Sequence, residues 1–89
     1  DALINKGSAF HLDGKYRDAI DCYDVALEID KNHPMALAYK GLSLAELGQL
    51  TEAIDYFKNA LSIDKHYYLA QISRDTAQEL LKSIQEKNI

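Results

Sequence analysis

The sequence contains a single cysteine, a single proline and no tryptophan among its 89 residues. Because Cys22 stands alone, an intramolecular disulfide and any metal site built from several cysteines are excluded, and a reducing, cytoplasmic compartment is expected. No apolar run is long enough to predict a membrane span or a secretory signal. The chain starts at Asp1 in what reads as the first turn of a helix, which favours a fragment of a longer parent.

Positive charge is also scarce, since 10 Lys and Arg residues stand against 14 Asp and Glu residues, for a net charge of -4. Nucleic acids and anionic membranes select for clustered Lys and Arg, so neither is an expected partner. With 47% apolar and 27% charged residues, the composition is that of a folded globular domain. The length suits one small domain.

What the sequence does have is an internal repeat with a period of 34 residues. Thirteen residue pairs are identical at that offset, without a gap: Ala2/Ala36, Leu3/Leu37, Lys6/Lys40, Gly7/Gly41, Gly14/Gly48, Ala19/Ala53, Ile20/Ile54, Asp21/Asp55, Ala26/Ala60, Leu27/Leu61, Ile29/Ile63, Asp30/Asp64 and Lys31/Lys65. A fixed period of this length is typical of proteins that stack one supersecondary unit. The sequence therefore predicts two units, residues 1 to 34 and residues 35 to 68.

Apolar residues in each unit recur at spacings of three and four, which predicts two amphipathic helices per unit. We expect these helices over residues 1 to 12, 16 to 30, 34 to 47 and 50 to 63. Gly14 and Gly48 end the first helix of each unit, because glycine readily adopts the left-handed conformation that stops a helix. Pro34 suits the first position of the third helix, where no backbone N–H is needed.

A fifth helix is predicted over residues 67 to 87, and its two sides differ. The positions that continue the packing stripe of the earlier helices are polar here: Gln71, Asp75 and Gln78. Apolar side chains remain on the side of the preceding helices: Ala70, Ala77 and Leu81. A one-sided helix is expected where a stack is closed. The predicted fold is an all-α helical-hairpin solenoid, with two 34-residue repeats and a C-terminal capping helix at residues 69 to 89 in one domain.

Over the whole chain the unit resembles the tetratricopeptide repeat, a helix–turn–helix motif whose pattern is W-x₂-L-G-x₂-Y, A-x₃-F, A and P. The matching residues are Gly7, Phe10, Ala19, Tyr23 and Ala26 in the first unit, and Gly41, Leu44, Ala53, Phe57 and Ala60 in the second. The small residues fall where the two helices of a hairpin approach closely, and large residues fill the space around them. The departures from the pattern are Leu3 and Leu37 for Trp, Lys6 and Lys40 for Leu, and Lys31 and Lys65 for the closing Pro.

The residues that could carry catalysis or bind a metal are scattered along the chain. The three histidines, His11, His33 and His66, lie near helix ends or in loops, without the i, i+4 spacing that places two imidazoles on one helix face. Cys22 falls at an exposed-looking position with no histidine near it in sequence. The recurrent carboxylates, Asp21/Asp55 and Asp30/Asp64, repeat with the fold, which indicates solvated faces and helix-end contacts. We therefore expect no enzyme activity, no cofactor and no metal.

In the resembled family, the first helices of stacked repeats line a concave groove that binds peptides or helices. The resemblance places these residues at groove positions: Ile4, Ser8, His11, Met35, Ala38, Leu42, Ala45, Leu69 and Ile72, with Asp1, Thr76 and Glu79 beside them. Its larger apolar members would form an exposed patch, which a monomer seldom leaves bare: Ile4, Met35, Leu42, Leu69 and Ile72. The alternative is that Leu69 and Ile72 only pack the capping helix, and that Ala38 and Ala45 are small because the helices are crowded.

Some members of the family grip the C-terminal carboxylate of a heat-shock chaperone with a clamp of Asn, Lys and Arg. The matching positions in this sequence are Ile4, Ser8, Tyr39, Leu69 and Ser73, and none of them is basic. We therefore expect no chaperone carboxylate clamp.

These observations predict a non-catalytic protein–protein interaction module that binds an apolar or amphipathic peptide or helix of a partner in its groove. The rival hypothesis is self-association, as a homodimer or by helix exchange, because two repeats are fewer than the three usually needed for a stable stack. The side of the first helix with Ala2, Lys6 and Ala9 is where a second copy, or another repeat of a larger scaffold, would pack.

Overall fold

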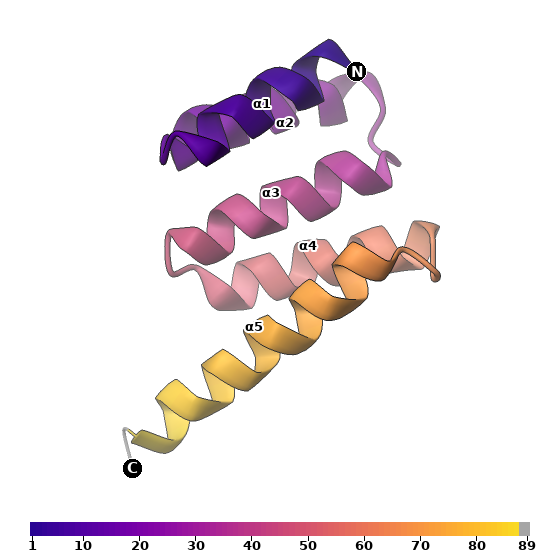
Figure 1. Cartoon of the computed structure of the whole chain (residues 1–89). Helices are drawn as coiled ribbons and strands as arrows, with labels where there is room; N and C mark the ends of the chain where they lie inside the picture. Colours follow the sequence, from indigo (N-terminus) through magenta and orange to yellow (C-terminus); the bar gives the residue numbers. More distant parts are fainter. Residues whose placement is uncertain (88–89) are drawn as a thin grey trace.

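The computed structural model describes residues 1 to 87, and these residues form five helices (Figure 1). The helices are α1 (Ala2–Leu12), α2 (Tyr16–Ile29), α3 (Pro34–Glu46), α4 (Leu50–Ile63) and α5 (Tyr68–Lys87). Two antiparallel pairs, α1 with α2 and α3 with α4, are stacked side by side, and α5 lies along the second pair. The predicted all-α helical-hairpin solenoid is confirmed, with helix ends within one residue of the predicted ones.

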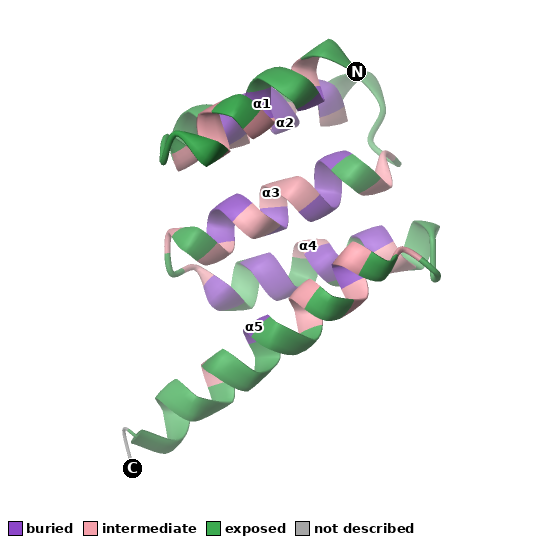
Figure 2. Ribbon diagram, viewed as in Figure 1, coloured by how far each residue is buried: buried purple, intermediate pink, exposed green. Residues whose placement is uncertain are grey.

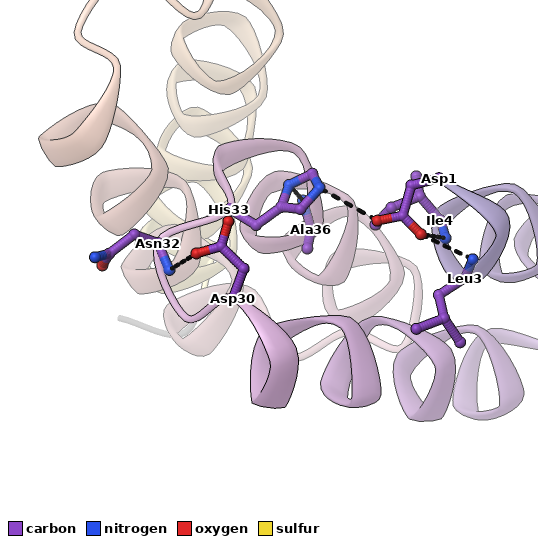
Figure 3. A network of polar contacts seen from close by, with 7 residues as sticks. All are labelled: Asp1, Leu3, Ile4, Asp30, Asn32, His33 and Ala36. Atoms are coloured by element: carbon purple, nitrogen blue, oxygen red, sulfur yellow. Dashed lines mark hydrogen bonds and ion pairs between the residues drawn. The ribbon is translucent and has the colours of Figure 1, made fainter.

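The helix ends follow from local side-chain and backbone chemistry. Asp1 caps α1, because its Oδ1 accepts the backbone N–H groups of Leu3 at 2.9 Å and Ile4 at 3.4 Å (Figure 3). Gly14 and Gly48 follow α1 and α3 with φ angles of +77° and +81°, the left-handed conformation expected of a glycine that ends a helix.

The joint between the two pairs is held by side chains that cap backbone groups. Pro34 is the first residue of α3, as predicted, and His33 caps that helix through Nδ1, which accepts the Ala36 N–H at 3.3 Å. The other ring nitrogen of His33 lies 3.6 Å from Oδ2 of Asp1, so one contact links the starts of α1 and α3 (Figure 3). Asp30 accepts the N–H of Asn32 at 3.1 Å, which confirms its predicted helix-end role.

Within each pair the helices approach closely at a glycine. A Cβ atom added to Gly7 would collide with the ring of Tyr23, and one added to Gly41 would lie 2.5 Å from Cε1 of Phe57. Both rings are buried, and Ala53 of the second pair has no exposed surface. The predicted alternation of small and large residues at this contact is confirmed.

The fifth helix packs on α4 with its residues up to Leu81. Ala70 and Ala77 are buried, and Leu81 contacts the core cluster that contains Leu50 and Phe57. Beyond this contact the side chains of the last turns are exposed, as the colouring of α5 in Figure 2 shows. The predicted capping segment of residues 69 to 89 includes two residues, 88 and 89, that lie outside the described part of the chain.

One prediction about the core was wrong. Cys22, expected at an exposed position, is only 8% exposed. It lies three residues after Ala19 and four before Ala26, both of which are buried, so it shares the packed face of α2. Of the helices within residues 1 to 87, none is both long and apolar enough to span a bilayer.

Candidate functional site

Two apolar hollows adjoin each other where α1, α3 and α5 come together. The first has a volume of about 320 Å³ and is lined by Ser8, His11, Leu12, Tyr23, Tyr39, Leu42 and Leu69. The second has a volume of about 350 Å³ and is lined by Leu42, Ala45, Glu46, Leu50, Phe57, Ile72, Ser73, Thr76, Ala77 and Leu80. Leu42 of α3 lines both, so the two hollows meet at this side chain and together make up the candidate site.

Six of the nine predicted groove residues line this site. Ser8, His11 and Leu69 line the first hollow, Ala45 and Ile72 line the second, and Leu42 is shared. Each of these side chains is half-buried or exposed. Thr76, placed beside the groove by the resemblance, lines the second hollow as well.

The other three predicted residues lie elsewhere, and this corrects the predicted apolar patch. Ile4 is only 2% exposed, because it packs in the cluster that contains Tyr23 and Ala36. Ala38 is fully buried against Ala60 and Ala70. Both are core residues, so a ligand in the hollows does not touch them.

Met35 is exposed, as the resemblance implied, but it lines a separate recess. That recess lies at the joint between the helix pairs and is lined by His33, Pro34, Met35, Asp64 and Tyr67. The first turn of α3 therefore contributes to a different surface from Leu42, which lies two turns farther along the same helix.

Sequence reasoning missed Leu12 and Tyr23 in the lining of the first hollow, and it named Tyr39 only as a position that matches the chaperone clamp. Leu12, at the end of α1, is 86% exposed, while Tyr23 forms the floor and is almost fully buried. The ring of Tyr39 meets the ring of Tyr23 edge to face, with centroids 5.9 Å apart. Tyr23 was recognisable only as a core position of the repeat. Tyr39 aligns with Asn5 at the 34-residue offset, so the repeat carried no signal for it.

His11 is held at the rim of the first hollow by a contact between the two pairs. Its Nδ1 lies 2.8 Å from Oγ of Ser43, and its ring meets that of Tyr16 edge to face at 5.1 Å. In some enzymes a histidine activates a neighbouring serine hydroxyl as a nucleophile by acting as its general base. Ser43, however, is fully buried, so its hydroxyl is out of reach of a substrate and the pair fixes α1 against α3.

The lining of the site carries little charge. Burial raises the pKa of the Tyr23 hydroxyl above its ordinary value of 10.0, and the neighbouring Tyr39 adds to the rise, although a hydrogen bond with Ser8 opposes it. The floor of the first hollow is therefore neutral at physiological pH. Among residues 1 to 87, the lining of the two hollows includes one carboxylate, Glu46, and no Lys or Arg.

The positions that match the chaperone carboxylate clamp fall in or near this site. Ser8, Tyr39 and Leu69 line the first hollow, Ser73 lines the second, and Ile4 is buried in the core. These five side chains are hydroxylic or apolar, so each lacks the positive charge that a carboxylate clamp requires. The expected absence of a clamp remains a prediction.

Comparison with known proteins agrees with this architecture. Family models described as "Tetratricopeptide repeat" match residues 1–33 and residues 34–67. The search of curated proteins finds no match.

Three similar solved structures are domains of the same kind. The second TPR of Spaghetti (RPAP3), bound to HSP90 peptide SRMEEVD, superposes with a TM-score of 0.87 at 26% identity, over 96% of this chain and 79% of that one. The first TPR of Spaghetti (RPAP3), bound to the same peptide, superposes with a TM-score of 0.88 at 26% identity, over 96% of this chain and 69% of that one. The second TPR domain of human RPAP3, in complex with HSP70 peptide SGPTIEEVD, superposes with a TM-score of 0.84 at 26% identity, over 94% of this chain and 70% of that one. The chain belongs to the tetratricopeptide repeat family.

Proposed function

We propose that this domain is a non-catalytic protein-interaction module, and that the two adjoining hollows bind a peptide or helix of a partner protein. The observation that carries the proposal is the pair of apolar hollows joined at Leu42. The similar domains of RPAP3 were solved with chaperone peptides, which supports a peptide as the class of ligand. The cytoplasmic location expected from the single cysteine remains a prediction.

The chemistry of the hollows favours a ligand with two large apolar side chains, one for each hollow. The lining offers aliphatic and aromatic surface, together with the neutral hydroxyls of Ser8 and Tyr39. Fully burying a Leu or Phe side chain contributes about 1.5–3 kcal/mol. A carboxylate in the same place would lose its hydration without gaining a cation, which is unfavourable.

We further propose that the domain does not grip a chaperone tail by its terminal carboxylate. The five side chains at the clamp positions are uncharged, and Glu46 would repel an acidic ligand in the second hollow. The peptide SRMEEVD is therefore expected to bind at least about tenfold more weakly than a neutral apolar peptide, because an unpaired buried charge costs more than about 1.4 kcal/mol. Equal affinity for the two peptides would contradict this part of the proposal.

The experiment is a selection from a random peptide library on the immobilised domain, followed by fluorescence anisotropy with the selected peptide. Ile72→Asp places a charge in the second hollow, and an affinity loss of roughly 10- to 100-fold is expected. Val25→Asp is the matched control, because Val25 is 42% exposed and Ile72 is 44% exposed, and Val25 lies outside both hollows. Equal loss in the two variants, or no loss at Ile72, would refute the site.

A homodimer is the second candidate function, and exposed apolar side chains on the far half of α5 favour it. Leu80 and Ile84 are 50% and 43% exposed, and Ile84 and Leu81 border a shallow recess beside Leu50. Light scattering across a dilution series distinguishes the two candidates. A dimer that Ile84→Asp converts to a monomer would support self-association, and a monomer at every concentration would exclude it.

A further inference from the structure

The two hollows of the candidate site are equivalent positions of the repeat. Their lining residues on α1 and α3 are pairs at the 34-residue offset: Ser8/Leu42, His11/Ala45 and Leu12/Glu46. The buried ring recurs as well, as Tyr23 in the first hollow and as Phe57 in the second. One position of the fold thus occurs twice with different side chains, so the differences show what each hollow selects in a ligand.

The most informative of these differences is at the last residue of each lining helix. Leu12 ends α1 at the edge of the first hollow, and Glu46 ends α3 at the edge of the second. Both side chains are exposed. A ligand side chain in the first hollow therefore has an aliphatic group at its edge, whereas one in the second hollow has a carboxylate.

The part of the chain that the structure describes does not neutralise this carboxylate. Among residues 1 to 87, Glu46 has no Lys, Arg or His within ion-pair distance. The last turn of α3 contains no basic residue, whereas that of α1 contains His11, and in the turn that follows Gln49 takes the position of Lys15. Because the C-terminal end of a helix carries a partial negative charge, the end of α3 adds to the charge of Glu46.

The capping helix contributes a second carboxylate near the same hollow. Glu79 is exposed and follows Thr76 by three residues and Ile72 by seven, so it lies on the side of α5 that these two lining residues share. Within residues 1 to 87 it also has no ion-pair partner. The second hollow is therefore accompanied by a carboxylate on α3 and another on α5, and the first hollow by neither.

We infer that the partner segment is cationic at one end and that this charge fixes its direction in the site. An apolar side chain lies in each hollow, and a Lys or Arg beside the second of them pairs with Glu46. A cation at the opposite end would face Leu12 and gain no charged partner. The inference rests on the proposed peptide function, and it adds the charge and the direction of the ligand, with Glu46 as the residue that determines both.

The test repeats the random-peptide selection on three immobilised chains: the original chain, Glu46→Lys and Glu28→Lys. The original chain should enrich Lys or Arg beside one of two apolar positions. Glu46→Lys should enrich Asp or Glu there and keep both apolar positions, and it should fold, because a cation suits the C-terminal end of α3. Glu28→Lys is the matched control and should keep the original preference, because Glu28 is exposed on α2, lies outside both hollows and gives the same change in net charge.

Binding of the peptide selected on the original chain then measures the contact with Glu46. Replacing its Lys or Arg by an uncharged residue of similar length should weaken binding about two- to fivefold, as expected of a solvent-exposed ion pair, and should have no effect on Glu46→Gln. A spin label at the cationic end of the peptide reports the direction. It should broaden the amide signals of Ser73 and Thr76 more than those of Ser8 and His11.

The outcomes separate this inference from the proposed function. Apolar positions enriched without a cation, an unchanged preference in Glu46→Lys, an equal reversal in Glu28→Lys, or stronger broadening at Ser8 and His11 would each overturn the inference and leave the peptide site in place. A selection that yields no peptide, or peptides that bind Ile72→Asp as tightly as the original chain, would refute the site itself and the inference with it.

Discussion

The two helix pairs share one sequence pattern, but their surroundings differ. The second pair lies between α2 on one side and α5 on the other, whereas the first pair packs on α3 alone. As a result α3 has six buried residues and α1 has two, although the two helices are repeats of each other. The comparison shows that burial at a repeat position is set by the neighbouring helix pair, and only partly by the residue itself.

The same comparison explains where the peptide site lies. Tyr23 and Phe57 occupy equivalent core positions, and both are about 1% exposed. Phe57 belongs to the larger core cluster, which α5 closes with Ala77. Tyr23 forms the floor of the first hollow. Phe57 and Ala77 also border the second hollow, so each pair contributes one of its core rings to the candidate site.

The largest expected effect is truncation of the two core rings. Phe57→Ala should lower the free energy of unfolding by about 3–5 kcal/mol, because it leaves a cavity in the larger core cluster. Tyr23→Ala should cost less, because no residue of α5 packs in its cluster, whereas Ala77 of α5 packs in the cluster of Phe57. Urea denaturation followed by circular dichroism measures both values. An equal or greater loss for Tyr23→Ala would show that the first pair is packed as tightly as the second.

A smaller difference is expected at the two glycines that face these rings. In Gly41→Ala the new methyl group meets Phe57 at 2.5 Å, and Ala77 of α5 packs in the same cluster as Phe57, so overpacking should cost about 1–3 kcal/mol. In Gly7→Ala the clash is with Tyr23, whose ring can move toward the first hollow. We therefore expect a smaller loss of stability for Gly7→Ala. If chemical denaturation gives the same loss for both, the ring of Tyr23 is as confined as that of Phe57.

The two equivalent lysines should differ by a smaller amount again. Lys40→Met leaves Asp24 without its partner and should destabilise the chain by about 1 kcal/mol, since the carboxylate is still partly hydrated. Lys6→Met should change the stability by less than about 0.5 kcal/mol, because Lys6 is exposed. Thermal melts of the two variants at low salt provide the comparison. A larger loss at Lys6 would contradict the account.

The smallest effect is a difference in alkaline stability. Burial is the largest influence on Lys40 and lowers its pKa, but Asp24 and Tyr56 together raise the pKa above 10.5. Because the folded value is raised, the contribution of Lys40 is complete below pH 10.5 and is lost as the pH rises through the folded pKa. Burial also raises the pKa values of Tyr23 and Tyr67 above 10.0, so folding favours the neutral phenols and stability falls above that pH in every variant.

This expectation is checked by urea denaturation from about pH 8 to about pH 11. The original chain should lose more stability over this range than Lys40→Met, which retains only the tyrosine contribution. Identical pH profiles would show that the ion pair of Lys40 with Asp24 adds nothing to folding.

The fold was predictable because its signals are local and repeated. Gly14 and Gly48 end helices through their own backbone conformation, Pro34 starts one through its fixed φ, and Gly7 and Gly41 mark close helix contacts. Because of the 34-residue period, the glycine signals occur in both units and support the same prediction twice. Such features depend on the residue and its neighbours along the chain, so the sequence alone contains them.

The candidate site was only partly predictable, because its surface depends on contacts between helices. Ile4 and Ala38 occupy groove positions by register, but each points into a gap filled by another helix and is buried. Cys22 is a different case, because its spacing from Ala19 and Ala26 already places it on the packed face of α2. Tyr39 and Leu12 line the first hollow through the position of the neighbouring helices, for which the repeat gives no signal. The alignment to the repeat pattern predicted which face of α3 lines the hollows, but not how deeply each side chain on that face is buried.

The most direct test of the peptide site is a titration of the isotope-labelled chain with the library-selected peptide, followed through amide chemical shifts. The account predicts shifts that centre on Leu42 and extend to Leu69 and Ile72, with little change at Ala2, Lys6 and Ala9 on the exposed side of α1. Shifts centred on Lys6 and Ala9, or on Ile84 alone, would contradict it, because the ligand would then bind outside the two hollows.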